Sequence, residues 1–352
     1  MRRIEVKASR DYAVEIGPGL LDRAGELLRP LSGAGTAVIV TGEHVAALYA
    51  PRLRASLERA GFRVLQWTHP SGEAYKTLET YGALLSFLAR EGVGRNDLLL
   101  ALGGGVTGDL TGFAAATYQR GVDYAQVPTS LLAMVDSSVG GKTAVDLPEG
   151  KNLAGSFYQP LAVLCDPELL ETLPEEELRN GSAEVLKYAV LGDPALFELL
   201  TKDPSCVRTE RAIARCIEMK RDLVGEDEFD RGSRQLLNLG HSFGHAIEAC
   251  SEYRLRHGEA VAIGMAAVAR AATQMGILPT ADRDALLSAL ARLGLPDRTE
   301  ISAECLLQQI RRDKKRRGET ISLIVPERIG ACRILQVPLA EIPTWLRLGG
   351  IA

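Results

Sequence analysis

The spacing of apolar residues changes near the middle of this 352-residue chain, and that change constrains the fold more than any other feature. Before residue 173, short apolar runs alternate with stretches of helical length, which is typical of strands and helices in a parallel α/β sheet. After residue 174, the apolar positions follow a helical spacing almost throughout. The sequence therefore predicts an α/β domain over 1–173 and a mainly α-helical domain over 174–352.

The same spacing predicts individual elements. In the first domain, strands are predicted at 4–7, 12–16, 36–40, 63–68 and 97–102, and helices at 20–28, 45–60 and 77–91. Pro51 is expected to break the second of these helices. In the second domain, helices are predicted at 175–190, 193–201, 208–224, 236–252, 258–275, 281–293 and 302–312, followed by a hairpin of 321–325 with 332–337. Thr172 and Glu175 have the spacing of a capping box, which places the domain boundary beside them.

Three of the five histidines, at positions 241, 245 and 257, lie within seventeen residues. Neutral imidazole is a common zinc ligand, and residues four apart lie on one face of a helix, so spacing alone favours His241 and His245 as a metal or acid–base pair. One capping, one core and one loop histidine is the structural alternative. The His-Glu-x-x-His pattern of zinc proteases is absent, and no Cys-x-x-Cys pair completes a closed structural site.

A glycine-rich segment at 103–108 follows the apolar strand and matches G-x-G-x-x-G, in which backbone amides approach a pyrophosphate. It lies in a late βα unit and lacks a clear acidic residue at a strand end about twenty positions further on. On this motif alone, a tight turn without a nucleotide is an equal alternative. A second segment, 136–143, ends in Gly-Gly-Lys-Thr but has Asp136 where an ATP-hydrolysing P-loop requires glycine.

The composition of the chain limits the classes of molecule that it is expected to bind. A net charge of −4 and a pI near 5.9 argue against nucleic acid and against an anionic membrane. The longest apolar run, 260–269, is too short to span a bilayer, and no apolar signal region follows the first residues. The six cysteines show no framework spacing, which predicts reduced thiols in a cytoplasmic protein.

Ordered motifs along nearly the whole chain resemble the 3-dehydroquinate synthase family of the sugar-phosphate cyclase superfamily. They are found at 70–76, 103–109, 118–121, 126–143, 151–152, 183–188, 234–248, 256–259 and 313–315. The resemblance implies a Rossmann-like α/β domain with a parallel sheet, a mainly helical C-terminal domain and an active site in the interdomain cleft. It also implies a homodimer.

The resemblance further implies a divalent metal, zinc by default with cobalt as a substitute, held by Glu184, His241 and His257. His245, which spacing alone would make a ligand, becomes a proton-transfer residue. The implied NAD contacts are Glu73, Lys76, Gly103, Gly104, Gly105, Asp109, Thr129, Ser130, Lys142, Lys151 and Thr172. The implied substrate residues are Arg120, Asp136, Lys142, Asn152, Lys187, Lys220, Arg234, Asn238, His245 and one of Lys314 and Lys315. Glu43 receives no role.

The implied enzyme is a phosphorus–oxygen lyase of the shikimate pathway, which leads to chorismate and the aromatic amino acids. It would convert 3-deoxy-D-arabino-heptulosonate 7-phosphate to 3-dehydroquinate and phosphate by transient oxidation with NAD, phosphate elimination, re-reduction and intramolecular aldol closure. The carboxylate and phosphate of this substrate match the basic residues above. The alternatives are a sister sugar-phosphate cyclase, a metal- and NAD-dependent polyol dehydrogenase, and a metal- or nucleotide-binding protein without turnover.

Overall fold

The computed structural model describes residues 1–252, 254–314 and 319–352. Within it the chain forms two compact units. The first comprises Met1–Leu173 and Lys220–Phe229, and the second comprises Pro174–Met219 and Asp230–Ala352. The assignment of nucleotide binding to the first domain and of metal binding to the second stays a prediction.

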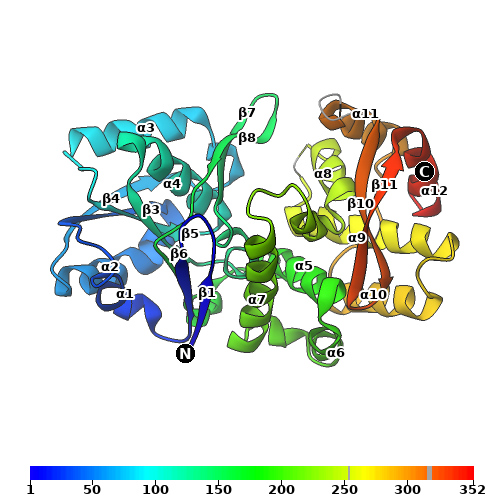
Figure 1. The fold of residues 1–352 in the computed structure, drawn as a ribbon, viewed down its shortest axis with the longest axis horizontal. Coiled ribbons are helices and arrows are strands. Elements are labelled where there is room, and N and C mark those ends of the chain that lie inside the picture. The colour runs from blue at the N-terminus through cyan, green and yellow to red at the C-terminus, as the bar shows by residue number, and fades with distance from the viewer. Residues whose placement is uncertain (253, 315–318) are drawn as a thin grey trace. The chain divides into compact units, whose positions relative to one another are not determined.

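The first unit is built on a seven-stranded sheet with the order β1-β2-β9-β6-β5-β3-β4 (Figure 1). The strands predicted at 4–7 and 12–16 are found as β1 (Arg2–Val6) and β2 (Tyr12–Ile16), which form an antiparallel pair. The remaining strands pair in parallel and are β3 (Thr36–Gly42), β4 (Arg63–His69), β5 (Leu98–Gly103), β6 (Asp123–Pro128) and β9 (Ala162–Cys165). All six residues of β5 are buried, as expected for a central strand of a parallel sheet.

Four helices accompany this sheet: α1 (Leu20–Leu28), α2 (Glu43–Arg59), α3 (Leu78–Arg90) and α4 (Gly105–Thr117). The predicted break at Pro51 is wrong, because α2 continues through this residue. Pro51 lies on the exposed side of the helix, where water can bond to the carbonyl that proline leaves without a backbone donor.

A separate antiparallel hairpin, β7 (Lys142–Leu147) with β8 (Gly150–Phe157), carries several of the predicted site residues. The sequence does not predict it, because its glycines and charged residues give no regular apolar alternation. The ring of Phe157 meets that of Phe229 edge-on, at 5.3 Å between centroids. The segment Lys220–Phe229 thus packs with the first unit, although it follows a stretch of the second.

The second unit is mainly helical, as predicted. Its helices are α5 (Glu175–Gly192), α6 (Pro194–Lys202), α7 (Glu210–Glu226, whose last residues count with the first unit), α8 (His241–Cys250), α9 (His257–Gln274), α10 (Thr280–Arg292), α11 (Ala303–Lys314) and α12 (Ile342–Leu348). The strands β10 (Thr320–Arg328) and β11 (Ala331–Pro338) form the predicted late hairpin. None of the helices in the described parts of the chain combines the length and apolar character that a membrane span requires.

In the second unit one predicted helix start and one predicted helix cap are wrong, although α5 begins at Glu175 as predicted. The segment 236–252 is not one helix, since Gly240 adopts a left-handed conformation at φ 78° and α8 begins only after it. The predicted capping box of Thr172 and Glu175 does not form, because Pro174 precedes the first residue of α5. The Thr172 hydroxyl instead pairs with the hydroxyl of Tyr49.

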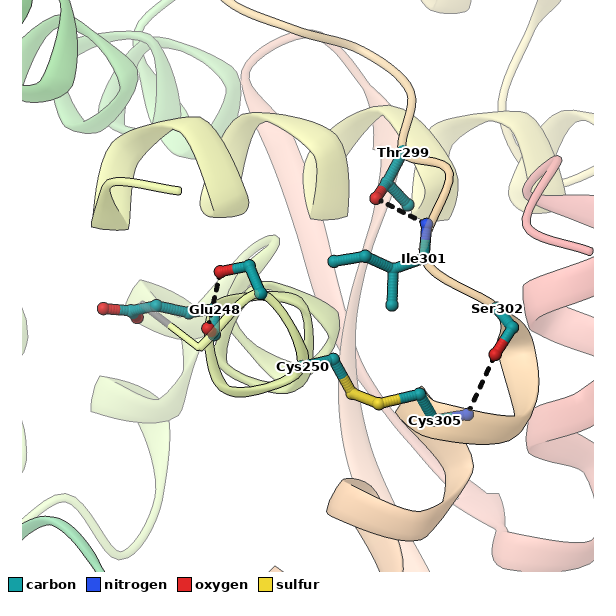
Figure 2. Close-up of a disulfide and its surroundings, with 7 residues drawn as sticks. Glu248, Cys250, Thr299, Ile301, Ser302 and Cys305 are labelled. Atoms are coloured by element: carbon teal, nitrogen blue, oxygen red, sulfur yellow. Dashed lines mark hydrogen bonds between the residues drawn. A yellow bond between two sulfur atoms is a disulfide. The ribbon is translucent and has the colours of Figure 1, made fainter. Parts of the chain in front are cut away.

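A disulfide joins Cys250, the last residue of α8, to Cys305 in α11 (Figure 2). The prediction of six reduced cysteines is therefore wrong for this pair, while Cys165, Cys206, Cys216 and Cys332 form no disulfide. The two bonded residues are 55 positions apart and carry no spacing signal. The packing of α8 against α11 brings their Cα atoms to 6.2 Å.

Candidate active site

Glu184, His241 and His257 lie together in the second unit, on three different helices. Glu184 belongs to α5, while His241 and His257 are the first residues of α8 and α9. One donor atom from each residue lies within 4.8 Å of the other two. The nearer Glu184 oxygen, Oε1, is 3.5 Å from His241 Nε2 and 3.4 Å from His257 Nε2. One carboxylate and two imidazoles fit a zinc-like ion that keeps a position open for substrate.

The second nitrogen of each ring points to a hydrogen-bond acceptor. His241 Nδ1 lies 3.1 Å from the carbonyl oxygen of Leu239, and His257 Nδ1 lies 3.4 Å from Glu248 Oε2. Because both partners are acceptors, the proton of each neutral ring belongs on Nδ1. That tautomer presents the Nε2 lone pair to the space beside Glu184.

The two histidines differ in protonation. Burial lowers the pKa of His241 to about 3. Burial opposes a charge on His257 as well, but hydrogen bonds to Glu184 and Glu248 outweigh it and raise its pKa to about 9. At neutral pH, the metal-free site therefore contains one neutral and one protonated imidazole.

Two further residues from the sequence prediction surround this group. The His245 ring lies 5.3 Å from that of His241 and 5.9 Å from that of His257, between centroids, although His245 is not one of the three grouped donors. Lys187 forms an ion pair with Glu184, and both side chains are buried. The geometry thus supports Glu184, which the resemblance implies, over His245, which spacing alone favours.

Close helix packing brings these residues together. A Cβ on Gly264 of α9 would lie 2.1 Å from the carbonyl oxygen of Gly240, immediately before α8. A Cβ on Gly258 would lie 2.0 Å from the carbonyl oxygen of Asn180 in α5. Only glycine permits contacts this short, so Gly264 lets α9 approach the start of α8, and Gly258 lets the first turn of α9 approach α5.

Gly264→Ala is expected to lower the free energy of unfolding by about 2 kcal/mol, because the added methyl group meets backbone that cannot move aside. Gly82→Ala in α3 is the matched control, since a Cβ there has no neighbour within 4 Å. That change should raise stability by about 1 kcal/mol through helix propensity. Urea unfolding measures both variants, and equal effects of the same sign would refute the packing argument.

In the first unit, the glycine-rich segment lies at the switch point of the sheet. The parallel strands have the spatial order β4-β3-β5-β6-β9, so the chain moves outward from β3 to β4 and then crosses back to β5. Thr41 of β3 pairs with Leu102 of β5, and the adjoining carboxyl ends of such strands are where these sheets bind nucleotides. In the sequence alone, the late position of the glycine motif argues against nucleotide binding. In the folded sheet, the same position is where a nucleotide site is expected.

The loop between β5 and α4 has the shape of a phosphate cradle. A Cβ on Gly104 would lie 3.2 Å from Ser130 Oγ, and one on Gly105 would lie 3.3 Å from Ser137 Oγ. The backbone N–H of Thr129 donates to the carbonyl of Gly103 at 3.0 Å. Gly104 and Gly105 add no side chain of their own at the start of α4, where the first N–H groups of a helix can bind the pyrophosphate of a dinucleotide.

Lys76 connects residues that the resemblance assigns to NAD with one that it assigns to substrate. Its buried Nζ donates to Asp109 Oδ2 at 2.6 Å and to Asn152 Oδ1 at 2.5 Å. Lys151 Nζ lies 3.5 Å from Glu73 Oε1 nearby. Burial lowers the pKa of Lys76, but the negative charges of Asp109 and Glu73 have a larger opposite effect. The pKa of Lys76 is therefore raised above its usual value. The contact with Asn152 has no counterpart in the sequence analysis.

The other predicted residues of the first unit are more scattered. Lys220 Nζ donates to the Asp136 carbonyl at 2.7 Å and also pairs with the Asp136 carboxylate. Arg120 ends a 3-10 helix with φ 64°, and Lys142 is exposed at the start of β7.

In the second unit, Arg234 and Asn238 both lie on the 3-10 helix Ser233–Asn238, where Arg234 is only 1% exposed. The predicted lysine, Lys314 or Lys315, lies outside the part of the chain whose side chains are described. Glu248 is the residue that the sequence analysis misses. It follows His241 by seven positions and His245 by three, a spacing that places all three on one face of α8.

Two family models match consecutive parts of the chain. The 3-dehydroquinate synthase N-terminal model covers residues 66–180, and the 3-dehydroquinate synthase C-terminal model covers residues 181–316. A 3-dehydroquinate synthase of Streptococcus pneumoniae (strain ATCC 700669 / Spain 23F-1) is 43% identical over 342 residues, which is 95% of this chain and 96% of the relative. One from Xylella fastidiosa (strain M12) is 45% identical over 348 residues, 94% and 93% of the two chains.

Solved structures share the fold over nearly the whole chain. A 2-deoxy-scyllo-inosose synthase complexed with carbaglucose-6-phosphate, NAD+ and Co2+ gives a TM-score of 0.88 at 25% identity, covering 98% of this chain and 99% of that one. A 2-epi-5-epi-valiolone synthase from Streptomyces hygroscopicus subsp. jinggangensis 5008, with NAD+ and Zn2+ bound, gives 0.88 at 29% identity, covering 99% of each. An iron-containing alcohol dehydrogenase, at 0.68 and 15% identity, shares the fold alone and covers 99% of each chain.

Proposed function

This chain belongs to the 3-dehydroquinate synthase family, and from that premise we propose that it converts 3-deoxy-D-arabino-heptulosonate 7-phosphate to 3-dehydroquinate and phosphate. One observation carries the proposal. The chain is 43% and 45% identical to two 3-dehydroquinate synthases over almost its full length, against 25% and 29% for the two solved sister cyclases. A sugar-phosphate substrate follows from the family.

We propose that a divalent metal binds to Glu184, His241 and His257, and that NAD binds at the glycine segment after β5. The donor set of the first site and the glycine-rich start of α4 at the second support these assignments. When bound, the metal would supply Lewis acidity at a substrate hydroxyl, and NAD would supply a reversible hydride acceptor. Zinc is the expected ion, with cobalt as a substitute, since solved relatives contain Zn2+ or Co2+.

The chain's own residues bind, orient and move protons. His245 is assigned proton transfer, because its ring lies beside both proposed histidine ligands without belonging to the donor group. Lys76 holds Asn152, whose backbone takes a φ of 56°, in place near the nucleotide site. The basic and amide groups proposed to bind the carboxylate and phosphate of the substrate are Arg120, Lys142, Asn152, Lys187, Lys220, Arg234 and Asn238.

The test follows phosphate release and NADH absorbance together, with 3-deoxy-D-arabino-heptulosonate 7-phosphate, NAD and zinc. Phosphate release without lasting NADH, abolished by a chelator, is the expected result, because the oxidation and re-reduction cancel. Lasting NADH without phosphate would instead identify a polyol dehydrogenase of the same fold. Neither signal from metal-loaded protein would indicate a sister cyclase with another sugar phosphate.

Metal binding at pH 7 is expected to release about one proton per ion. His257, with a pKa of about 9, is protonated below that pH and must lose its proton to ligate. His241, with a pKa of about 3, is already neutral and contributes none. Calorimetry in buffers of different ionisation enthalpy measures the number, which should fall toward zero above pH 9. A value of zero at pH 7 would contradict the protonation assigned to His257.

We also propose a homodimer in the cytoplasm. The dimer is checked by light scattering of the purified full chain. The Cys250–Cys305 disulfide is unusual for the cytoplasm, where thiols are kept reduced. Cell fractionation tests the location, and alkylation of thiols at the moment of lysis shows whether this disulfide is formed there.

A further inference from the structure

Glu248 is a buried carboxylate that the family resemblance leaves without a role. It is 5% exposed and lies in the last turn of α8, on the face that carries His241 and His245. Its Oε2 lies 3.4 Å from His257 Nδ1, the ring nitrogen directed away from Glu184. A buried carboxylate normally requires such a partner, because burial disfavours its charge.

We propose that Glu248 is a positioning residue for the metal, which accepts the Nδ1–H of His257 and so fixes the ring with Nε2 toward Glu184. The inference rests on the proposed metal site. Glu248 acts through His257 and is not itself a ligand. A carboxylate in this position also makes Nε2 of the imidazole a stronger electron-pair donor, which strengthens its bond to a metal ion.

The other histidine provides a contrast within the same site. His241 Nδ1 faces a neutral backbone carbonyl, that of Leu239, at 3.1 Å. Of the two Nδ1 partners, only that of His257, the Glu248 carboxylate, carries a charge. Removing Glu248 should weaken the His257 bond while leaving the orientation of His241 unchanged, because a carbonyl of the main chain remains whatever the side chain at 248.

The end of α8 is held firmly enough to position this carboxylate. The Ser251 hydroxyl donates to the Glu248 carbonyl at 2.7 Å and accepts from the backbone N–H of Leu255 at 3.2 Å. Cys250, two residues after Glu248, is bonded to Cys305, and Figure 2 shows the Glu248 side chain directed away from that disulfide. Two separate links thus fix the helix turn that carries Glu248.

The experiment compares Glu248→Ala and Glu248→Gln with the wild-type full chain. Zn2+ affinity is measured by chelator competition, and the visible absorption of the Co2+-loaded protein reports ligand geometry. Glu248→Ala should weaken Zn2+ binding by about 10–100-fold and change the Co2+ spectrum. Glu248→Gln should lose less, since the amide oxygen accepts the same hydrogen bond without the charge. Glu252→Gln, an exposed carboxylate beyond the end of α8, is the matched control and should match the wild type.

The results distinguish the proposed metal site from the proposed role of Glu248. If the wild type binds no Zn2+, the proposed metal site itself is overturned. If the wild type binds Zn2+ and both Glu248 variants keep its affinity and its Co2+ spectrum, only the role of Glu248 is overturned. A purely structural Glu248 would lower the unfolding temperature of the metal-free protein and leave the affinity of the folded fraction unchanged. If Glu248→Ala does not fold, the affinity of Glu248→Gln decides, because that variant keeps the shape of the side chain.

Discussion

His257→Ala is expected to abolish stable metal binding and to reduce turnover by about 10³-fold or more. The change removes one of three protein donors, leaving Glu184 and His241 to hold the ion. Lewis-acid stabilisation of developing charge amounts to several kcal/mol, and about 1.4 kcal/mol corresponds to a tenfold rate. Metal content by mass spectrometry of the dialysed protein and the phosphate-release assay measure the two effects.

His245→Ala is the informative comparison for that variant. The His245 ring lies on the same face of α8 as that of His241, so spacing alone would make His245 a ligand as well. We expect this variant to retain its metal and to lose activity, because a proton-transfer group is removed and the three donors remain. Loss of metal from His245→Ala together with its retention in His257→Ala would reverse the ligand assignment.

Breaking the Cys250–Cys305 disulfide should lower the free energy of unfolding by about 4 kcal/mol. In the chain-entropy model, a cross-link between residues 55 positions apart removes that much conformational freedom from the unfolded chain. Urea unfolding of the oxidised protein and of Cys305→Ser measures the difference. Oxidised wild-type protein should expose four thiols when denatured, as the four free cysteines require.

Cys332→Ser provides the control, since Cys332 is free and its change leaves the chain topology intact. Its effect should be much smaller, being limited to a weak hydrogen bond from Sγ to the Val190 carbonyl at 3.6 Å. Equal stability of the oxidised protein and Cys305→Ser, or equal losses in the two serine variants, would contradict the expected role of the cross-link.

Elements with a strong apolar period are predictable from the sequence. The helix at 20–28 is found at these residues as α1, and the predicted 258–275 differs from α9 by one residue at each end. Predictions that rest on a single residue are overridden by packing. Pro51 does not break α2, and Thr172 bonds to Tyr49 instead of capping α5. The preference of a single residue for a helix cap or a helix break is worth only a small part of the folding free energy. Tertiary contacts can therefore override it.

The site is visible in the sequence only in part. The histidines near 241 form a local cluster, so their spacing reveals them, whereas Glu184 lies on another helix and is implied only by the resemblance. The bond from Lys76 to Asn152 and the Cys250–Cys305 disulfide join residues distant in the chain. No periodicity encodes such pairs, because only the packing of the folded units brings them into contact. Glu248 could have been found, since it shares a helix face with two of the histidines.

Both histidines of the proposed metal site are the first residues of their helices. The aligned peptide dipoles place about half a positive elementary charge at each helix start. Two such starts meet at one site, so the protein scaffold adds positive potential where a cation is to bind. The carboxylates of Glu184 and Glu248 offset that repulsion. If a substrate hydroxyl is held beside these helix starts, the same positive potential would lower its pKa, at the cost of some affinity for the ion.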